Sequence, residues 1–285
     1  MIEVWYNTLD LIVPFEWGHY LFMKNALLAI LVITPVFALL GTMVVSNRMA
    51  FFTDVLGHSA LAGIAIGIVC GIQDPTWPMI IMAIVLALLV NIFKGWTQAS
   101  MDTVLGVFLA FMVALGITIL SREGGFVKYT VYLIGDILAV TPMQIAWLSG
   151  ISVLVLVYWY VAGNALILTS VNSSLARSRR IKTLLIEMSF TIFLAVVVML
   201  SIRLVGILII NSLLVLPAAA SRNFARSTRS YTLWAIIFSM VSGVTGLITS
   251  YYWGTASGAT IVLFSVGCYM LSALLGRVTS KAMRT

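Results

Sequence analysis

The chain has 285 residues, of which 62% are hydrophobic and 9% are charged, and its formal net charge is +7. A soluble domain is about 45–50% apolar and about 25% charged, so this composition indicates a membrane protein and excludes the soluble, disordered and disulfide-rich classes. The two cysteines, Cys70 and Cys268, lie in apolar runs, which favours buried free thiols over a disulfide or a metal cluster.

The first 20 residues combine aromatic side chains with three acids and lack the basic stretch that begins a cleavable signal peptide. We therefore expect 1–20 to form an interfacial segment that lies along the membrane surface. A transmembrane helix needs about 20 mainly apolar residues. Candidate spans lie at about 21–45, 50–71, 77–93, 103–120, 144–168, 183–202, 204–220, 231–252 and 258–275.

These segments predict an all-α fold, a polytopic bundle of about eight or nine transmembrane helices that forms one domain over 1–285. The segment 204–220 is the weakest, because a glycine, an asparagine, a serine and a proline interrupt it, and eight crossings with one half-length helix are the alternative. The connection 121–143 is long enough for a short helix, and Pro142 is expected to open the next span. Trp253 and Gly254 should form the turn of a hairpin between the last two spans.

The basic residues orient the chain. With nine alternating crossings, 12 of the 16 Lys and Arg residues fall on one side of the membrane. Cytoplasmic loops carry the excess of Lys and Arg, so the C-terminus is predicted to be cytoplasmic. This distribution accounts for the positive charge without a nucleic-acid partner.

Sequence motifs of enzymes are missing. The sequence contains neither GxSxG nor HExxH, and no lysine follows a glycine, so a Walker A loop is excluded. The chain cannot hydrolyse ATP by a P-loop mechanism, and we expect a transport subunit rather than an enzyme. An intramembrane enzyme would need a catalytic set larger than the one ionisable pair described next.

Asp54 and His58 form the sharpest polar constellation, four residues apart on one face of a predicted span. Ionisable groups in the hydrocarbon are costly and usually line a cavity or a substrate path. Carboxylate and imidazole suit a divalent transition metal such as Zn²⁺ or Mn²⁺, but one chain supplies two of the four ligands of a tetrahedral zinc site, and a second copy would complete it. Alternatively, Asp54 accepts a hydrogen bond from His58 or from a neighbouring helix.

The run VNSSLARSRRIKTLL is a second constellation, basic and predicted to be cytoplasmic. Asn172 or Ser173 could cap a short helix whose cationic residues are Arg177, Arg179, Arg180 and Lys182. Anchoring to the inner leaflet or contact with lipid is the simpler explanation. Docking to a soluble partner is the alternative.

The chain resembles the permease subunits of bacterial ATP-binding-cassette importers for zinc, manganese and iron. Five stretches and the basic helix carry the resemblance over most of the chain, in order: MAFFTDVLGHSALAGIAIG at 49–67, DTVLGVFLA at 102–110, YLIGDILAVTP at 132–142, LVGILIINSLLVLPAAASR at 204–222 and SGATIVLFSVGCYML at 257–271. YLIGDILAVTP and LPAAASRNFARS look more like the zinc branch. Some zinc permeases carry a histidine early in the fourth span, where this chain has the apolar run 108–111, so manganese stays open.

The resemblance implies an all-helical permease fold similar to that of cobalamin and siderophore permeases. It implies a homodimer in the lipid of the bacterial cytoplasmic membrane, with two cytoplasmic ATPase subunits and an extracytoplasmic metal-binding protein. Zn²⁺ or Mn²⁺ would be the cargo, with no permanently bound cofactor. Asp54 and His58 would then lie in the translocation pathway. The segment 172–182 would be the coupling helix that seats in the ATPase, through Leu175, Arg177, Arg179, Arg180 and Ile181.

A self-contained secondary metal carrier is the competing function. Such carriers are built from internal repeats with broken helices at corresponding places in the two halves. The sequence shows no convincing repeat, which favours the permease.

Overall fold

The structure is a computed structural model that describes residue 6, residues 16–122 and residues 136–282. The described part is helical and contains no strand. Its elements are η1 (Glu16–His19), α2 (Leu21–Ser46), α3 (Ala50–Val69), α4 (Thr76–Trp96), α5 (Met101–Arg122), η2 (Ile137–Ala139), α7 (Pro142–Val171), α8 (Ser173–Ser178), α9 (Thr183–Val205), α10 (Ile207–Ser221), α11 (Thr228–Trp253) and α12 (Ser257–Ala282).

Eight of the described helices are long and apolar enough to cross a membrane, and α10, with 15 residues, is shorter. The interrupted segment 204–220 is thus the short helix α10, and the choice between eight and nine full crossings stays a prediction. Pro142 opens α7, as predicted. Most of the interfacial segment 1–20 and residues 123–135 of the predicted external helix lie outside the described residues. Both cysteines are free, but Cys70 is exposed rather than buried.

The contacts divide the described chain into two compact units. One contains residues of Met1–Thr42, Asp136–Leu154 and Leu208–Thr285, and the other contains residues of Met43–Gly135 and Val155–Ile207. The divisions fall inside α2 and α7 and next to the start of α10, so those helices contribute residues to both units.

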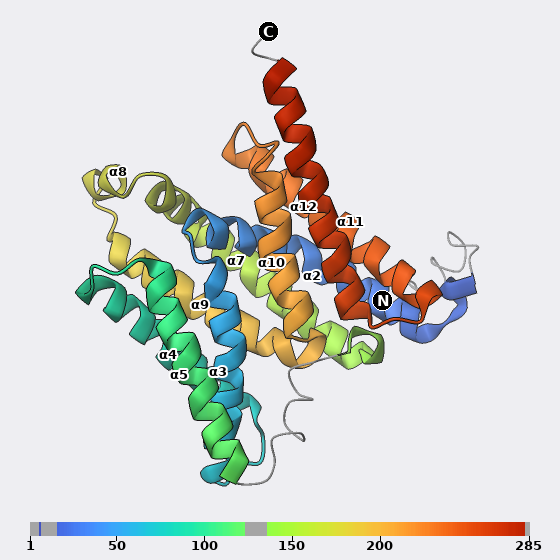
Figure 1. Cartoon of the computed structure of the whole chain (residues 1–285), viewed down its shortest axis with the longest axis horizontal. Helices are drawn as coiled ribbons and strands as arrows, with labels where there is room; N and C mark the ends of the chain where they lie inside the picture. The colour runs from blue at the N-terminus through green and yellow to red at the C-terminus, as the bar shows by residue number, and fades with distance from the viewer. Residues whose placement is uncertain (1–5, 7–15, 123–135, 283–285) are drawn as a thin grey trace. The chain divides into compact units, whose positions relative to one another are not determined.

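The unit that contains α3 is built on close helix contacts. In Figure 1, α3, α4 and α5 run side by side, and α4 also packs against α9. Gly63 brings α3 against the backbone of α4, since a Cβ there would lie 2.8 Å from the Cα of Met79. Gly116 similarly brings α5 against α3, since a Cβ there would lie 3.2 Å from the Ala62 backbone nitrogen. Small residues permit this approach, and without a hydrophobic driving force between helices in lipid the packing itself stabilises the bundle.

In the other unit, α11 and α12 form the predicted helical hairpin. Gly254 ends α11 with a φ of 62°, a left-handed conformation that glycine adopts without a steric penalty. Gly246 lets the two helices touch, because a Cβ there would lie 2.6 Å from the Cα of Ile261. The Ser239 hydroxyl on α11 donates to the carbonyl of Thr34 on α2 at 3.1 Å, which ties the hairpin to the first long helix.

Candidate functional site

Asp54 and His58 lie one helical turn apart on α3, as the sequence predicts, and both are half-buried. The helix begins after a tight turn in which Arg48 takes a φ of 57° and the Met49 N–H donates to the carbonyl of Val44. This turn separates α3 from α2 without a glycine. Asp54 and His58 are near enough to interact electrostatically.

One ring nitrogen of His58 makes no hydrogen bond within the described structure. Its Nδ1 atom is buried and has no hydrogen-bond partner among the described residues. An unpaired polar atom in an apolar environment costs free energy, so such an atom is satisfied by a water, a ligand or a second chain. This observation favours a binding role for His58 over a purely structural one.

The pair is incomplete as a metal centre within one chain. Over the described residues, no group of three or more His, Cys, Asp and Glu side chains lies close enough together to hold an ion. Two ligands of the right chemical kind are present, and a tetrahedral zinc site needs two more. The chemistry fits a divalent metal that is shared between two copies or held transiently.

The helix in the basic segment 172–182 is shorter than the sequence predicted. Asn172 caps α8, its side chain accepting from the N–H groups of Ser174 and Leu175 at 3.0 Å each. The helix ends at Ser178, so Arg179, Arg180 and Lys182 follow it instead of lying on it. The stop is a Schellman turn, in which the Ile181 N–H donates to the carbonyl of Ala176 and Arg180 takes a φ of 60°.

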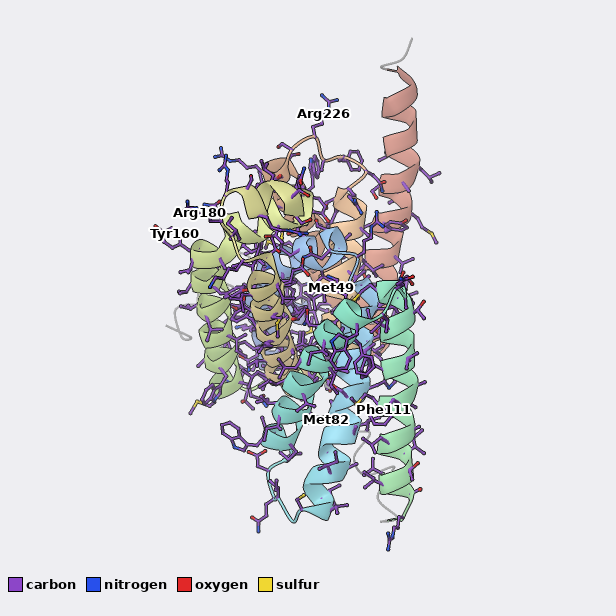
Figure 2. The ribbon with its side chains drawn as sticks, turned by 90° about the vertical axis from the view of Figure 1, so that its left-hand side faces the viewer. Met49, Met82, Phe111, Tyr160, Arg180 and Arg226 are labelled. Carbon is purple, nitrogen blue, oxygen red and sulfur yellow. The ribbon has the colours of Figure 1, made fainter. Side chains whose placement is uncertain are left out.

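The turn places the cationic residues of this segment outward. Arg177, Arg179 and Arg180 are exposed, and Leu175 presents an exposed apolar side chain beside them. Figure 2 shows Arg180 at the outside of the turn that follows α8. Ile181 is half-buried and begins the connection to α9. An exposed apolar side chain in a segment with three exposed arginines is suited to docking a soluble protein as well as to contact with lipid headgroups.

A polar clasp, which we define as Asn91, Lys94, Glu187 and Thr191, joins α4 to α9. Lys94 Nζ lies 2.7 Å from Glu187 Oε2, and Asn91 Nδ2 donates to Thr191 Oγ1 at 2.6 Å. The sequence places Glu187 about one turn inside the predicted span 183–202, which favours a structural role, whereas the sequence analysis missed Asn91. The available signal was the matching spacing, i and i+3 on α4 and i and i+4 on α9, which puts each pair of polar residues on one helix face.

A small pocket lies at the clasp and not at the Asp54–His58 pair. Its lining comes from the turn before α3 and from α4, α5 and α9: Asn47, Met49, Asn91, Lys94, Met101, Glu187, Phe190 and Thr191. We assign the pocket to imperfect packing around the clasp, because its lining offers a single carboxylate that is already paired.

The family model of the ABC 3 transport family matches residues 19–276. The chain belongs to this family. Similar proteins include the high-affinity zinc uptake system membrane protein ZnuB of Haemophilus influenzae, 36% identical over 87% of this chain and 95% of the relative. The manganese import system permease protein ScaB of Streptococcus gordonii is 29% identical over 88% of this chain and 90% of the relative.

A solved structure of PsaBC from Streptococcus pneumoniae in complex with Fab superposes with a TM-score of 0.75 and 24% identity, covering 95% of both chains. At that identity the superposition shows the fold, and it confirms the predicted all-α permease architecture. Membership of the ABC 3 transport family confirms that this chain is a multi-pass membrane transport subunit and not an enzyme. The roles of individual residues stay predictions.

Proposed function

We propose that this chain is the membrane permease of an ATP-binding-cassette importer that moves a divalent transition metal into the cytoplasm, with Zn²⁺ preferred over Mn²⁺ or Fe²⁺. The observation that carries the proposal is the Asp54–His58 pair on a membrane-spanning helix, with a buried ring nitrogen that no described residue satisfies. The zinc uptake protein at 36% identity and the manganese import protein at 29% support a metal cargo and a modest preference for zinc.

In the proposed assembly two copies of the chain supply a shared site of two carboxylates and two imidazoles. One chain has two suitable donors and, among its described residues, no third one nearby, so a second copy supplies the missing ligands. The ATPase activity resides in two separate cytoplasmic subunits, because the sequence lacks a Walker A loop. An extracytoplasmic protein delivers the metal, the protein sits in the bacterial cytoplasmic membrane, and the C-terminus is cytoplasmic.

The segment 172–182 is proposed to seat in the ATPase. Three features support this role: the arginines are exposed, Leu175 is exposed beside them, and a cap and a Schellman turn fix the local backbone. A segment that served only to contact lipid would not need a fixed conformation. Movement of the ATPase would reach the membrane through α9, which starts directly after the segment.

Uptake of radioactive zinc into cells or vesicles tests the site. Asp54→Ala and His58→Ala should each abolish uptake while membrane abundance stays normal, since either change removes two of four ligands from a shared site. Asp102→Ala and His19→Ala are matched controls, because both residues are exposed and lie outside α3. Wild-type uptake by both α3 variants would reduce the pair to a packing role.

Charge reversal tests the docking proposal. A triple change of Arg177, Arg179 and Arg180 to Glu should release the ATPase during purification and leave metal binding in the membrane unchanged. Arg122→Glu, an exposed arginine at the end of α5, is the control. The docking role is wrong if the triple variant retains the ATPase and its hydrolysis still responds to the loaded delivery protein.

A further inference from the structure

The face of α3 that carries Asp54 and His58 also carries a notch. Residues 54, 57, 58 and 61 recur with the spacing i, i+3, i+4 and i+7, which places them on one side of a helix. Gly57 therefore leaves a gap between the carboxylate and the imidazole. Gly57 is buried, so another part of the chain fills this gap.

The side chain of Ile207 fills the notch. A Cβ on Gly57 would lie 1.6 Å from Cδ1 and 2.7 Å from Cγ1 of Ile207, but 3.9 Å from its Cβ. The contact is thus made by the outer half of the isoleucine side chain and not by its backbone. Ile207 is half-buried, and it belongs to the same compact unit as α3.

A break in the helix determines where Ile207 stands. α9 ends at Val205, Gly206 takes φ 92° and ψ 156°, and α10 begins at Ile207. This conformation is open essentially to glycine alone. Non-helical backbone at membrane depth is tolerated where it is buried in protein or lines a water-filled cavity. Gly206 is buried, so the first situation applies: protein covers the break, and the break places the apolar side chain of Ile207 on the face of α3 that carries Asp54 and His58.

We propose that Ile207 is a gate residue over the Asp54–His58 face. With the side chain in the Gly57 notch, apolar atoms stand between the two metal ligands and exclude water, as hydrophobic constrictions do in channels. A divalent cation reaches both ligands when Ile207 leaves the notch, and the Gly206 break is the joint about which it leaves. The inference rests on the proposed function of the Asp54–His58 pair and adds the element that controls access to it.

A double-mutant cycle tests whether the Ile207 side chain occupies the Gly57 notch. Gly57→Ala alone should lower the thermal stability of the purified permease with its ATPase, because Cδ1 and Cγ1 of Ile207 obstruct the new methyl group. In an Ile207→Ala background the same change should cost nothing further, since the remaining Cβ lies 3.9 Å away, an ordinary contact distance. Additive effects of Gly57→Ala and Ile207→Ala on thermal stability would mean that the two residues are not in contact.

Chemical reactivity of His58 tests the gate. The chain has two histidines, and diethyl pyrocarbonate acylates exposed imidazoles, so mass spectrometry can follow His58 with the exposed His19 as internal reference. Ile207→Ala removes Cδ1 and Cγ1 from the notch and should raise the His58-to-His19 rate ratio by about tenfold or more, given the free energy of about 0.8 kcal/mol associated with each buried CH₂ group. Leu208→Ala, which shortens the next, exposed apolar side chain, should leave the ratio unchanged.

Zinc protection separates the gate from the proposed function. Zn²⁺ should protect His58 from acylation in the wild type, and Asp54→Ala should abolish this protection. Zinc protection that is lost in Asp54→Ala, together with an unchanged rate ratio in Ile207→Ala, would overturn the gate and leave the metal site standing. A raised ratio in Ile207→Ala without any zinc protection would support a gate over His58 while removing the metal role of the pair.

Discussion

Among the described glycines, Gly41 makes the closest approach to the backbone of a neighbouring helix. A Cβ added to this residue of α2 would lie 1.8 Å from the carbonyl oxygen of Leu214 on α10 and 3.2 Å from its Cα. An ordinary contact begins at about 3.4 Å, so Gly41→Ala requires a separation of roughly 1.6 Å between the two helices. The obstructing atom belongs to the backbone, and no change of rotamer can remove it.

The expected destabilisation follows from two opposing effects. Alanine is favoured over glycine within a helix by about 1 kcal/mol. Overpacking of a close contact costs about 1–3 kcal/mol, and a backbone obstruction belongs at the upper end of this range. We therefore expect Gly41→Ala to lower the free energy of unfolding by about 2 kcal/mol.

Gly106→Ala on α5 is the matched control, because nothing lies within 4 Å of a Cβ at that position. It should stabilise the protein by up to about 1 kcal/mol through helix propensity alone. The two variants should therefore differ by about 3 kcal/mol in unfolding of the purified protein by sodium dodecyl sulfate in mixed micelles. A Gly41→Ala variant as stable as Gly106→Ala would refute the close approach of α2 and α10.

Two further predictions concern the coupling segment and the polar clasp. Arg180→Gly should weaken co-purification of the ATPase without lowering thermal stability, because glycine keeps the left-handed turn while the charge is lost. Arg48→Gly is the control at a turn of the same kind: it should relieve about 1 kcal/mol of backbone strain and leave the ATPase bound. Asn91→Ala should cost about 1–2 kcal/mol in the same unfolding assay, since Asn91 is buried and bonds to Thr191. Lys94→Met should cost less than about 1 kcal/mol, because the Lys94 side chain is 44% exposed and solvent screens its ion pair. A larger loss for Lys94→Met than for Asn91→Ala would reverse our ranking of the two contacts.

The membrane helices were predictable because lipid leaves the backbone few choices. Without water to satisfy N–H and C=O groups, an apolar stretch of sufficient length forms a helix whatever its neighbours are. The span predicted at 50–71 is α3, Ala50–Val69, and the interrupted stretch 204–220 is the short helix α10, Ile207–Ser221. Asp54 and His58 were found for the same reason, since two ionisable residues stand out in a hydrocarbon environment.

The end of α8 was not predictable from residue types. A helix stop is usually marked by glycine in the left-handed position, and here Arg180 occupies it. The basic run was therefore read as a longer helix than Ser173–Ser178. Likewise Asp102 was a reasonable cap for α5 by type, whereas the Ser100 hydroxyl accepts the Thr103 N–H at 3.2 Å. The local sequence offers more than one residue that can cap the helix, and the conformation of the preceding chain determines which of them does.

By itself, the sequence determined the fold class, the approximate positions of the apolar helices and the ionisable pair, because each depends on local composition and on the solvent in which the chain folds. Only the tertiary structure decided which residues of different helices contact each other. Glu187 meets Lys94 across 93 positions, and Ile207 enters the notch of Gly57 across 150. Periodic spacing can show which residues share one helix face, but it does not show which faces meet, because that is decided by packing of side-chain shapes over the whole bundle.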